Sequence, residues 1–206
     1  MKKIILSCLL FTFTLILLAE TPQAEAIQSL DNAKGFIQQN NMQKAQDEIN
    51  FALSKISEIQ SEELVNYLPD TIPGFKLNEK NAEGLGQAAG IFGGGNGIMA
   101  KGNYYNDNEG SIDITINVGG IMSKTSALAQ MFGAGAGAGV GTGTKSVRVN
   151  GYSGTIEFDS SSKDGKLTVQ VGEKINIIVE GSNIDSAETL KTIAGKIDMA
   201  KLEKAF

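Results

Sequence analysis

A glycine-rich run that ends in Lys145 and Ser146 is the stretch of this sequence most similar to a phosphate-binding loop. It reads GAGAGAGVGTGTKS over residues 133–146, and the backbone N–H groups of such loops can cradle phosphate. The spacing does not fit, because Thr144 stands where the phosphate-loop pattern has a glycine and because the run leads into a strand instead of a helix. We therefore interpret it as a loop without nucleotide chemistry. A lid, a membrane-contacting loop and a partner-docking segment are the alternatives.

A second glycine-rich run, GLGQAAGIFGGGNG over residues 84–97, contains the G-x-G of dinucleotide sites. It lacks the preceding strand and the acidic residue about 20 positions later that such a site needs. Its apolar side chains, among them Leu85, Ile91 and Phe92, are costly to expose to water. They would either pack beneath the N-terminal helices, which we favour, or fold over a hydrophobic ligand.

Aromatic and basic side chains of the predicted strands provide further candidate contacts. Tyr104 and Tyr105 are adjacent in a strand, so one must point to the core and the other to a surface. Arg148 alternates with valines and could bind a carboxylate ligand, although pairing with a neighbouring acid is the more common role. The possible partner or ligand contacts are therefore Leu85, Ile91, Phe92, Tyr104, Tyr105, Met131, Phe132 and Arg148.

Two acidic turns, at residues 106–110 and 159–164, carry carboxylate and amide oxygens that could bind calcium. Neither has the spacing of a calcium loop with its distal glutamate. Hairpin turns use the same residue types to satisfy their own backbone. We therefore predict no metal site and no cofactor.

The residue types that are missing exclude much of the remaining chemistry. The chain has no histidine, no tryptophan and a single cysteine, Cys8. Imidazole bases, Cys/His zinc sites and the Ser-His-Asp triad are therefore excluded. The net charge is −5 and Arg148 is the one arginine, a balance unsuited to phosphate backbones. We expect no enzymatic activity and no nucleic-acid partner.

The N-terminus has the order of a secretory signal peptide. Lys2 and Lys3 precede an apolar stretch up to Ala19, and Ala24-Glu25-Ala26 follows. We predict a signal peptide over residues 1–26 and a secreted, periplasmic protein. A retained membrane anchor is disfavoured because the stretch is shorter than the roughly 20 residues needed to span a bilayer. A lipoprotein is disfavoured because Cys8 lies inside the apolar region.

Residues 27–68 have the periodicity of helices. Two helices separated by Asn40-Asn41 form a hairpin, and Ser61 begins a short third helix that ends before Pro69. We expect the hairpin to dock on its own sheet, with docking on a partner as the alternative. The apolar residues predicted to line one face are Ile27, Leu30, Ala33 and Ile37 on the first helix, and Ala45, Ile49, Ala52, Leu53 and Ile56 on the second.

Residues 69–206 predict an α+β domain with glycine-rich loops. Apolar and polar residues alternate with a period of two from Lys145 to Glu180, which predicts a four-stranded meander. Strands at 98–105 and 111–118 precede it, and a helix after Asp185 closes the chain. We expect a twisted antiparallel sheet of six to seven strands with helices on one face. The predicted meander turns are Asn150-Gly151, Asp164-Gly165 and Gly172-Glu173.

Several segments in this order carry a resemblance to known proteins. The stretch NAKGFIQQNNMQKAQDEINFAL resembles one tetratricopeptide-type unit, without further copies. With LPDTIPGF, VRVNGY and the closing IDMAKLEKAF, the chain resembles uncharacterised secreted or periplasmic bacterial proteins. The second half is similar to α+β domains of the PsbP and Mog1 kind. The resemblance implies a fold and brings no catalytic residues.

Together these features favour a non-enzymatic binding or structural module of the bacterial cell envelope. It would bind a protein partner through its hairpin or its glycine-rich loops. The alternative is a periplasmic carrier or sensor of a small apolar ligand or lipid, with those loops as its lid.

Overall fold

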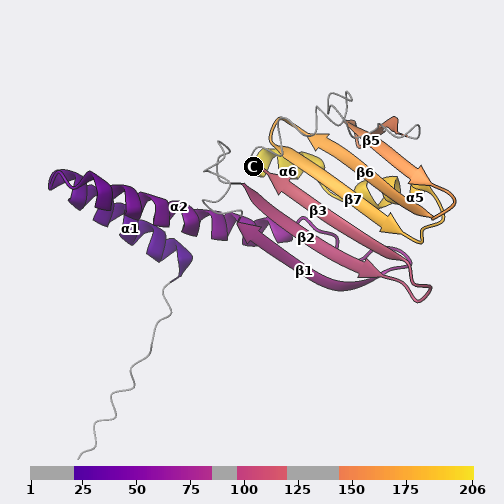
Figure 1. The fold of residues 1–206 in the computed structure, drawn as a ribbon, viewed down its shortest axis with the longest axis horizontal. Helices are drawn as coiled ribbons and strands as arrows, with labels where there is room; N and C mark the ends of the chain where they lie inside the picture. The colour runs from indigo at the N-terminus through magenta and orange to yellow at the C-terminus, as the bar shows by residue number, and fades with distance from the viewer. Residues whose placement is uncertain (1–20, 85–96, 120–143) are drawn as a thin grey trace, which may run out of the picture.

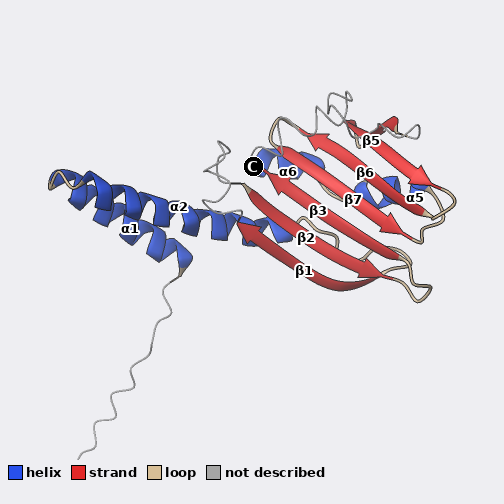
Figure 2. Cartoon of the chain, viewed as in Figure 1, coloured by secondary structure: helices blue, strands red, loops and turns tan. Residues whose placement is uncertain are grey.

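The structure is a computed structural model that describes residues 21–84, 97–119 and 144–206. In this part of the chain two N-terminal helices precede a seven-stranded antiparallel sheet, and helices close the chain (Figures 1 and 2). The predicted α+β class, leading hairpin and closing helix are confirmed. The helices are α1 (Pro22–Gln38), α2 (Met42–Val65), α5 (Ala187–Ala194) and α6 (Met199–Ala205).

The sheet has the strand order β1-β2-β3-β7-β6-β5-β4, and every neighbouring pair is antiparallel. The predicted meander forms β4 to β7, and the two predicted earlier strands form β2 and β3. Pairing of β3 with β7 joins the two halves, with Ile116 opposite Ile177. The strands are β1 (Lys76–Gly84), β2 (Ile98–Tyr105), β3 (Ser111–Val118), β4 (Lys145–Val149), β5 (Tyr152–Asp159), β6 (Asp164–Val171) and β7 (Ile175–Ser182).

Two of the three predicted meander turns are confirmed. Asn150 and Gly151 have φ of 51° and 89°, the positive values that a two-residue hairpin turn needs, and Gly172 has φ of 57°. The turn predicted at Asp164-Gly165 is wrong, because both residues lie in β6 and the chain turns just before them. Gly165 faces the core there, with a side-chain atom of Leu190 2.9 Å from where its Cβ would be.

The core lies on one face of the sheet, beneath α5, α6 and the last turns of α2 (Figure 1). Alternate residues of β3 and β7 point into it, as a period of two requires. Ile112, Ile114 and Ile116 are fully buried. Leu190 of α5 and Leu64 of α2 belong to the same cluster. One core therefore holds the end of the hairpin and the closing helices on the sheet.

The short third helix predicted at Ser61 is wrong, since α2 runs without a break to Val65. Ser57 donates its hydroxyl to the Leu53 carbonyl at 3.0 Å, and Ser61 donates to the Ser57 carbonyl at 2.5 Å. Serine can interrupt a helix by competing for backbone groups. Here each hydroxyl instead bonds the carbonyl one turn back, so the serine-rich stretch stays helical.

Polar contacts fix the end of α2 to the first strands. Lys80 of β1 donates to the Leu68 carbonyl at 2.7 Å and to the Asp70 carboxylate at 2.5 Å. Tyr104 of β2 donates its hydroxyl to the Pro69 carbonyl at 2.6 Å. The base of the hairpin is therefore held in place, while α1 and most of α2 project beyond the sheet (Figure 1).

Candidate functional site: the apolar face of the helical hairpin

Small side chains form the contact between α1 and α2. Ala26, Ser29 and Ala33 of α1 and Ala45 and Ala52 of α2 are all 5% exposed or less. The distance between packed helices depends on the side chains at the contact, and small residues let the two backbones approach closely. The hairpin thus closes without any large apolar residue between its helices at these positions.

Polar contacts between the two helices define their register. Asn32 donates to Glu48 at 3.5 Å, and Lys44 lies 5.4 Å from the centre of the Phe36 ring. In both pairs the residue numbers add up to 80. Residues whose numbers add up to about 80 therefore stand at the same level of the hairpin.

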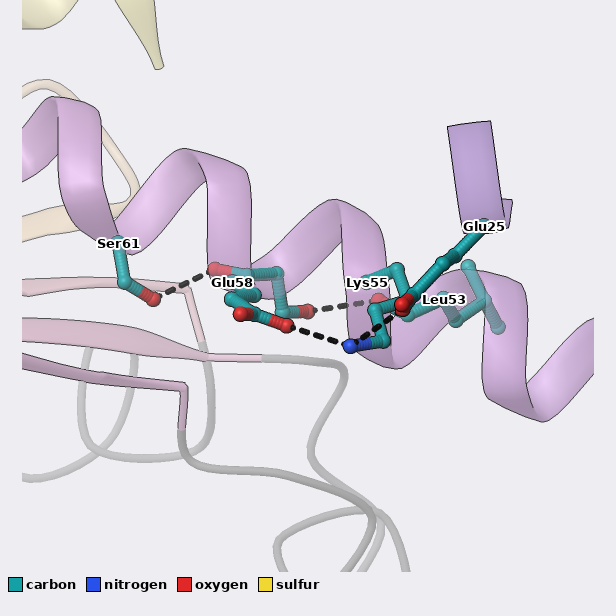
Figure 3. A network of polar contacts seen from close by, with 6 residues as sticks. Glu25, Leu53, Lys55, Glu58 and Ser61 are labelled. Carbon is teal, nitrogen blue, oxygen red and sulfur yellow. Dashed lines mark hydrogen bonds and ion pairs between the residues drawn. The ribbon is translucent and has the colours of Figure 1, made fainter. Parts of the chain in front are cut away.

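Lys55 is the centre of a network on one side of the hairpin (Figure 3). Its ammonium lies 2.6 Å from Glu25 of α1 and 3.1 Å from Glu58 of α2. It also lies 5.6 Å from the centre of the Phe51 ring. The hydrogen bonds that Lys55 donates to Glu25 and Glu58 raise the pKa of its ammonium above the ordinary value. Charged groups and aromatic rings on this side already have partners within the chain.

The structure divides the single apolar face that the sequence predicts on each helix. Ala33, Ala45 and Ala52 are buried, but Ile27, Leu30 and Ile37 are 62%, 48% and 46% exposed, and Leu53 and Ile56 are 42% and 38% exposed. The buried row of each helix is followed, one residue later, by a second row of large apolar residues. Helical periodicity cannot tell two such rows apart, and the row of small residues allows the closer contact.

These large residues lie on one side of the hairpin. Each exposed row follows its buried row by one residue, a rotation of about 100° on each helix. Because α1 and α2 are antiparallel, the same rotation turns both rows to the same side, opposite the Lys55 network. We call this surface the hairpin apolar face; it consists of Ile27, Leu30 and Ile37 of α1 and Met42, Ile49, Leu53 and Ile56 of α2.

Exposed apolar surface of this extent indicates an interaction site, because monomeric proteins rarely carry large contiguous apolar patches. Lys34 and Gln46 are the polar residues within the two rows. Sequence reasoning put these residues on the same helix face as the buried alanines and favoured docking of the hairpin on its own sheet. The spacing of the sequence contains a second row of large apolar residues, one residue after the row of small ones, and this second row forms the surface.

The residues predicted as partner or ligand contacts have different surroundings. Tyr104 is 1% exposed and belongs to the core, whereas Tyr105 is 45% exposed, so the two do point to opposite faces. Burial raises the pKa of the Tyr104 hydroxyl to about 12.

Arg148 is exposed on β4, with no carboxylate within ion-pair distance among the described residues. Leu85, Ile91, Phe92, Met131 and Phe132 lie outside the described residues, as do both glycine-rich runs for most of their length. The expectation that no strand precedes the run at residues 84–97 is wrong, because β1 ends at Gly84.

Two clefts in the described part of the chain are lined mainly by polar groups. One, of about 640 Å³, lies between the turn before β1, the β2–β3 turn and the segment after β7. Its groups are partnered, since Lys76 lies 2.6 Å from Asp107 and Asn183 donates to the Asn108 carbonyl at 2.7 Å.

The other cleft, of about 860 Å³, is shallow and open to solvent, and residues of β3, β5, β6 and β7 line it. Lys166 lies 2.9 Å from Glu180 there. Among the described residues, no three acidic, histidine or cysteine side chains stand where they could hold a metal ion. The clefts therefore offer less to a ligand than the hairpin apolar face offers to a partner.

Searches with family models, among curated proteins and among solved structures find no match to the chain. Within residues 21–84, 97–119 and 144–206, no helix has the length and apolar character needed to cross a bilayer.

Proposed function

We propose that this chain is a non-enzymatic binding module of the bacterial cell envelope that binds a protein partner through the hairpin apolar face. The observation that carries the proposal is the contrast between the two sides of the hairpin. One side presents a row of large apolar residues on each helix, and the other carries polar contacts made by Asn32, Lys44 and Lys55. A protein surface with apolar side chains would remove this face from water.

The helices are well suited to present such a face. The base of the hairpin is anchored to the sheet through Lys80 and Tyr104, and the rest projects beyond the sheet (Figure 2). A rigid helical pair held at one end keeps its binding residues in place before contact, which reduces the entropy lost on binding. The sheet then serves as the platform for the hairpin.

Site-specific crosslinking in living cells tests this proposal. In one variant a photoreactive amino acid replaces Lys34, in the middle of the hairpin apolar face. In a second variant it replaces Asp47, which is exposed on α2 and accepts a hydrogen bond from Gln43 at 3.4 Å. We expect a discrete protein adduct from position 34, identified by mass spectrometry, and none from position 47. Fractionation of the same cells tests the periplasmic location.

Two results would overturn the proposal. The first is equal crosslinking from both positions, which would mean that the face has no preference for a partner. The second is a protein that yields no adduct at position 34 and is purified with bound lipid detected by native mass spectrometry, which would favour an apolar-ligand carrier.

A further inference from the structure

We propose that the partner of the hairpin apolar face is a second copy of this chain. The two hairpins would pack face to face in a four-helix bundle, with a twofold axis parallel to the helices. This inference rests on the proposed function and specifies its partner. Four observations support it: a second packing seam, matched layers, the charge on the face and its area.

Each helix carries two seams with the spacing of bundle helices. In α1 the buried row is Ala26, Ser29 and Ala33, and the exposed row is Ile27, Leu30 and Ile37 with Lys34 between the last two. The second row of α2 follows residues 42, 46, 49, 53 and 56, of which Ile49 is half-buried and the others are exposed. Steps of three and four residues are typical of helices that pack in bundles and coiled coils. A helix in a four-helix bundle needs two seams, one for each neighbour, whereas a free hairpin needs one.

The apolar residues of the two helices stand at matching levels. By the register of the hairpin, residues whose numbers add up to about 80 share a level. A twofold axis along the helices places α1 of one copy against α2 of the other at the same levels. Apolar residues then meet apolar residues in three layers, and polar residues meet in one. The layers are Ile27 with Leu53, Leu30 with Ile49, Lys34 with Gln46, and Ile37 with Met42.

The opposite orientation does not match the layers. If the second hairpin ran in the reverse direction, the order of layers along α1 would be inverted. Leu30 would then meet the level of Lys34, which would bury an ammonium group against an apolar side chain at a cost of free energy. A polar layer that pairs only with itself is a known device for fixing the register of bundled helices. The structure therefore favours two hairpins that point the same way.

The charge on the face favours a protein over a membrane surface. Lys34 is the one charged residue within the two rows, whereas the surrounding helices carry more carboxylates than ammonium groups, among them Glu48, Glu58, Glu62 and Glu63. Interfacial helices that bind anionic lipid are instead rich in lysine and arginine on their polar face.

The area of the face suits a dimer. Half-exposed side chains of this size leave on the order of 500 Å² of apolar surface, at the upper end of patches on monomers. Two such faces would bury roughly 1,000 Å², which is about the apolar share of a standard protein interface.

Sedimentation equilibrium of the purified protein tests this inference. We expect a dimer, and we expect Leu30→Glu to raise its dissociation constant on the order of a hundredfold or more, because the two symmetric copies each lose a buried contact and gain a charge. Phe51→Glu is the matched control: Phe51 has the same exposed fraction as Leu30, 48%, but lies on the opposite side of the hairpin. It should leave the dimer intact. Circular dichroism checks that both variants remain folded, and Leu53→Glu provides a second variant on the other helix.

Thiol crosslinking tests the orientation. In a chain carrying Cys8→Ser, which leaves no other cysteine, a mixture of Ile27→Cys and Leu53→Cys proteins should be joined by a short bifunctional reagent. A mixture of Ile27→Cys and Ile37→Cys should be joined far less, and the reverse result would overturn the parallel arrangement.

The results separate this inference from the proposed function. A monomer at all concentrations, together with a position-34 adduct to a different protein in cells, would overturn the second copy as partner and leave the proposed function standing. A monomer without any adduct would overturn both. A dimer that Leu30→Glu does not weaken would show that the contact lies elsewhere.

Discussion

The Lys55 ammonium of α2 lies 2.6 Å from the Glu25 carboxylate of α1, so an ion pair joins the two helices near the base of the hairpin (Figure 3). Glu25 belongs to residues 1–26, which the sequence predicts to be a signal peptide. The helix itself begins at Pro22, after Thr21 as its N-cap. Removal of residues 1–26 would therefore also remove the first turn of α1.

A chain that begins at Ile27 should be less stable than one that begins at Thr21. The shorter chain lacks the Thr21 cap, which accepts a hydrogen bond from the Ala24 N–H at 3.3 Å, and loss of such a cap costs about 1 kcal/mol. It also lacks Ala26 and the partner of Lys55. Urea unfolding of both chains measures the difference, and N-terminal sequencing of the protein purified from cells shows which form the cell makes. Equal midpoints would mean that the first turn contributes nothing.

The contribution of Lys55 to stability should depend on pH. Its pKa in the folded protein is raised above the ordinary 10.5 by hydrogen bonds to Glu25 and Glu58. A raised folded pKa stabilises the protein below the unfolded pKa, and this stabilisation is lost as pH rises through the folded pKa. The melting temperature of Lys55→Met should therefore fall below that of the wild type at neutral pH and approach it in strong alkali. A difference that stays constant with pH would contradict this role.

Replacement of Tyr104 by phenylalanine should destabilise the fold by about 1 kcal/mol or more. The change removes the hydroxyl that donates to the Pro69 carbonyl at 2.6 Å and leaves that carbonyl without its partner. Tyr105→Phe is the control, because Tyr105 is exposed, and it should change little. Urea unfolding measures both. Similar losses from the two variants would show that the Pro69 contact is not what matters.

Ionisation of Tyr104 offers a second readout of its burial. Burial raises the pKa of its hydroxyl to about 12, so in spectrophotometric titration one tyrosine should ionise about two pH units above the ordinary value of 10. Because the unfolded chain loses this proton first, stability should fall as pH rises from about 10 to about 12. The late step should be absent from Tyr104→Phe.

Two glycine-to-alanine changes should have opposite effects. At Gly181 an added Cβ would stand 2.9 Å from Ile184 and 3.0 Å from Leu190, so Gly181→Ala should cost about 1–3 kcal/mol by overpacking between β7 and α5. At Gly35 in α1 no atom lies within 4 Å of the added Cβ. Gly35→Ala should stabilise the protein by roughly 0.5–1 kcal/mol through helix propensity. Thermal unfolding compares them, and a gain at Gly181 would contradict the packing described.

The strands could be predicted from the sequence because their signals are local. Alternation from Lys145 to Glu180 and the turn at Asn150-Gly151 depend on neighbouring residues only, and both are confirmed. The turn predicted at Gly165 is wrong, because a glycine needed for the close approach of a helix looks in sequence like a glycine needed for a turn. Leu190, which lies over Gly165, is 25 residues away and no local pattern connects the two.

The sequence by itself determined the α+β class, the excluded chemistries and the positions of β2 to β7, since composition and periodicity are properties of the chain alone. Only the tertiary structure decided that β3 pairs with β7 and that Ala33 packs inside the hairpin while Leu30 faces water. Both choices depend on which surfaces fit most closely in space. Two rows of residues one position apart on a helix have the same sequence spacing, so the spacing cannot say which row is buried. The row of small residues is buried because it allows the two helices to pack more closely.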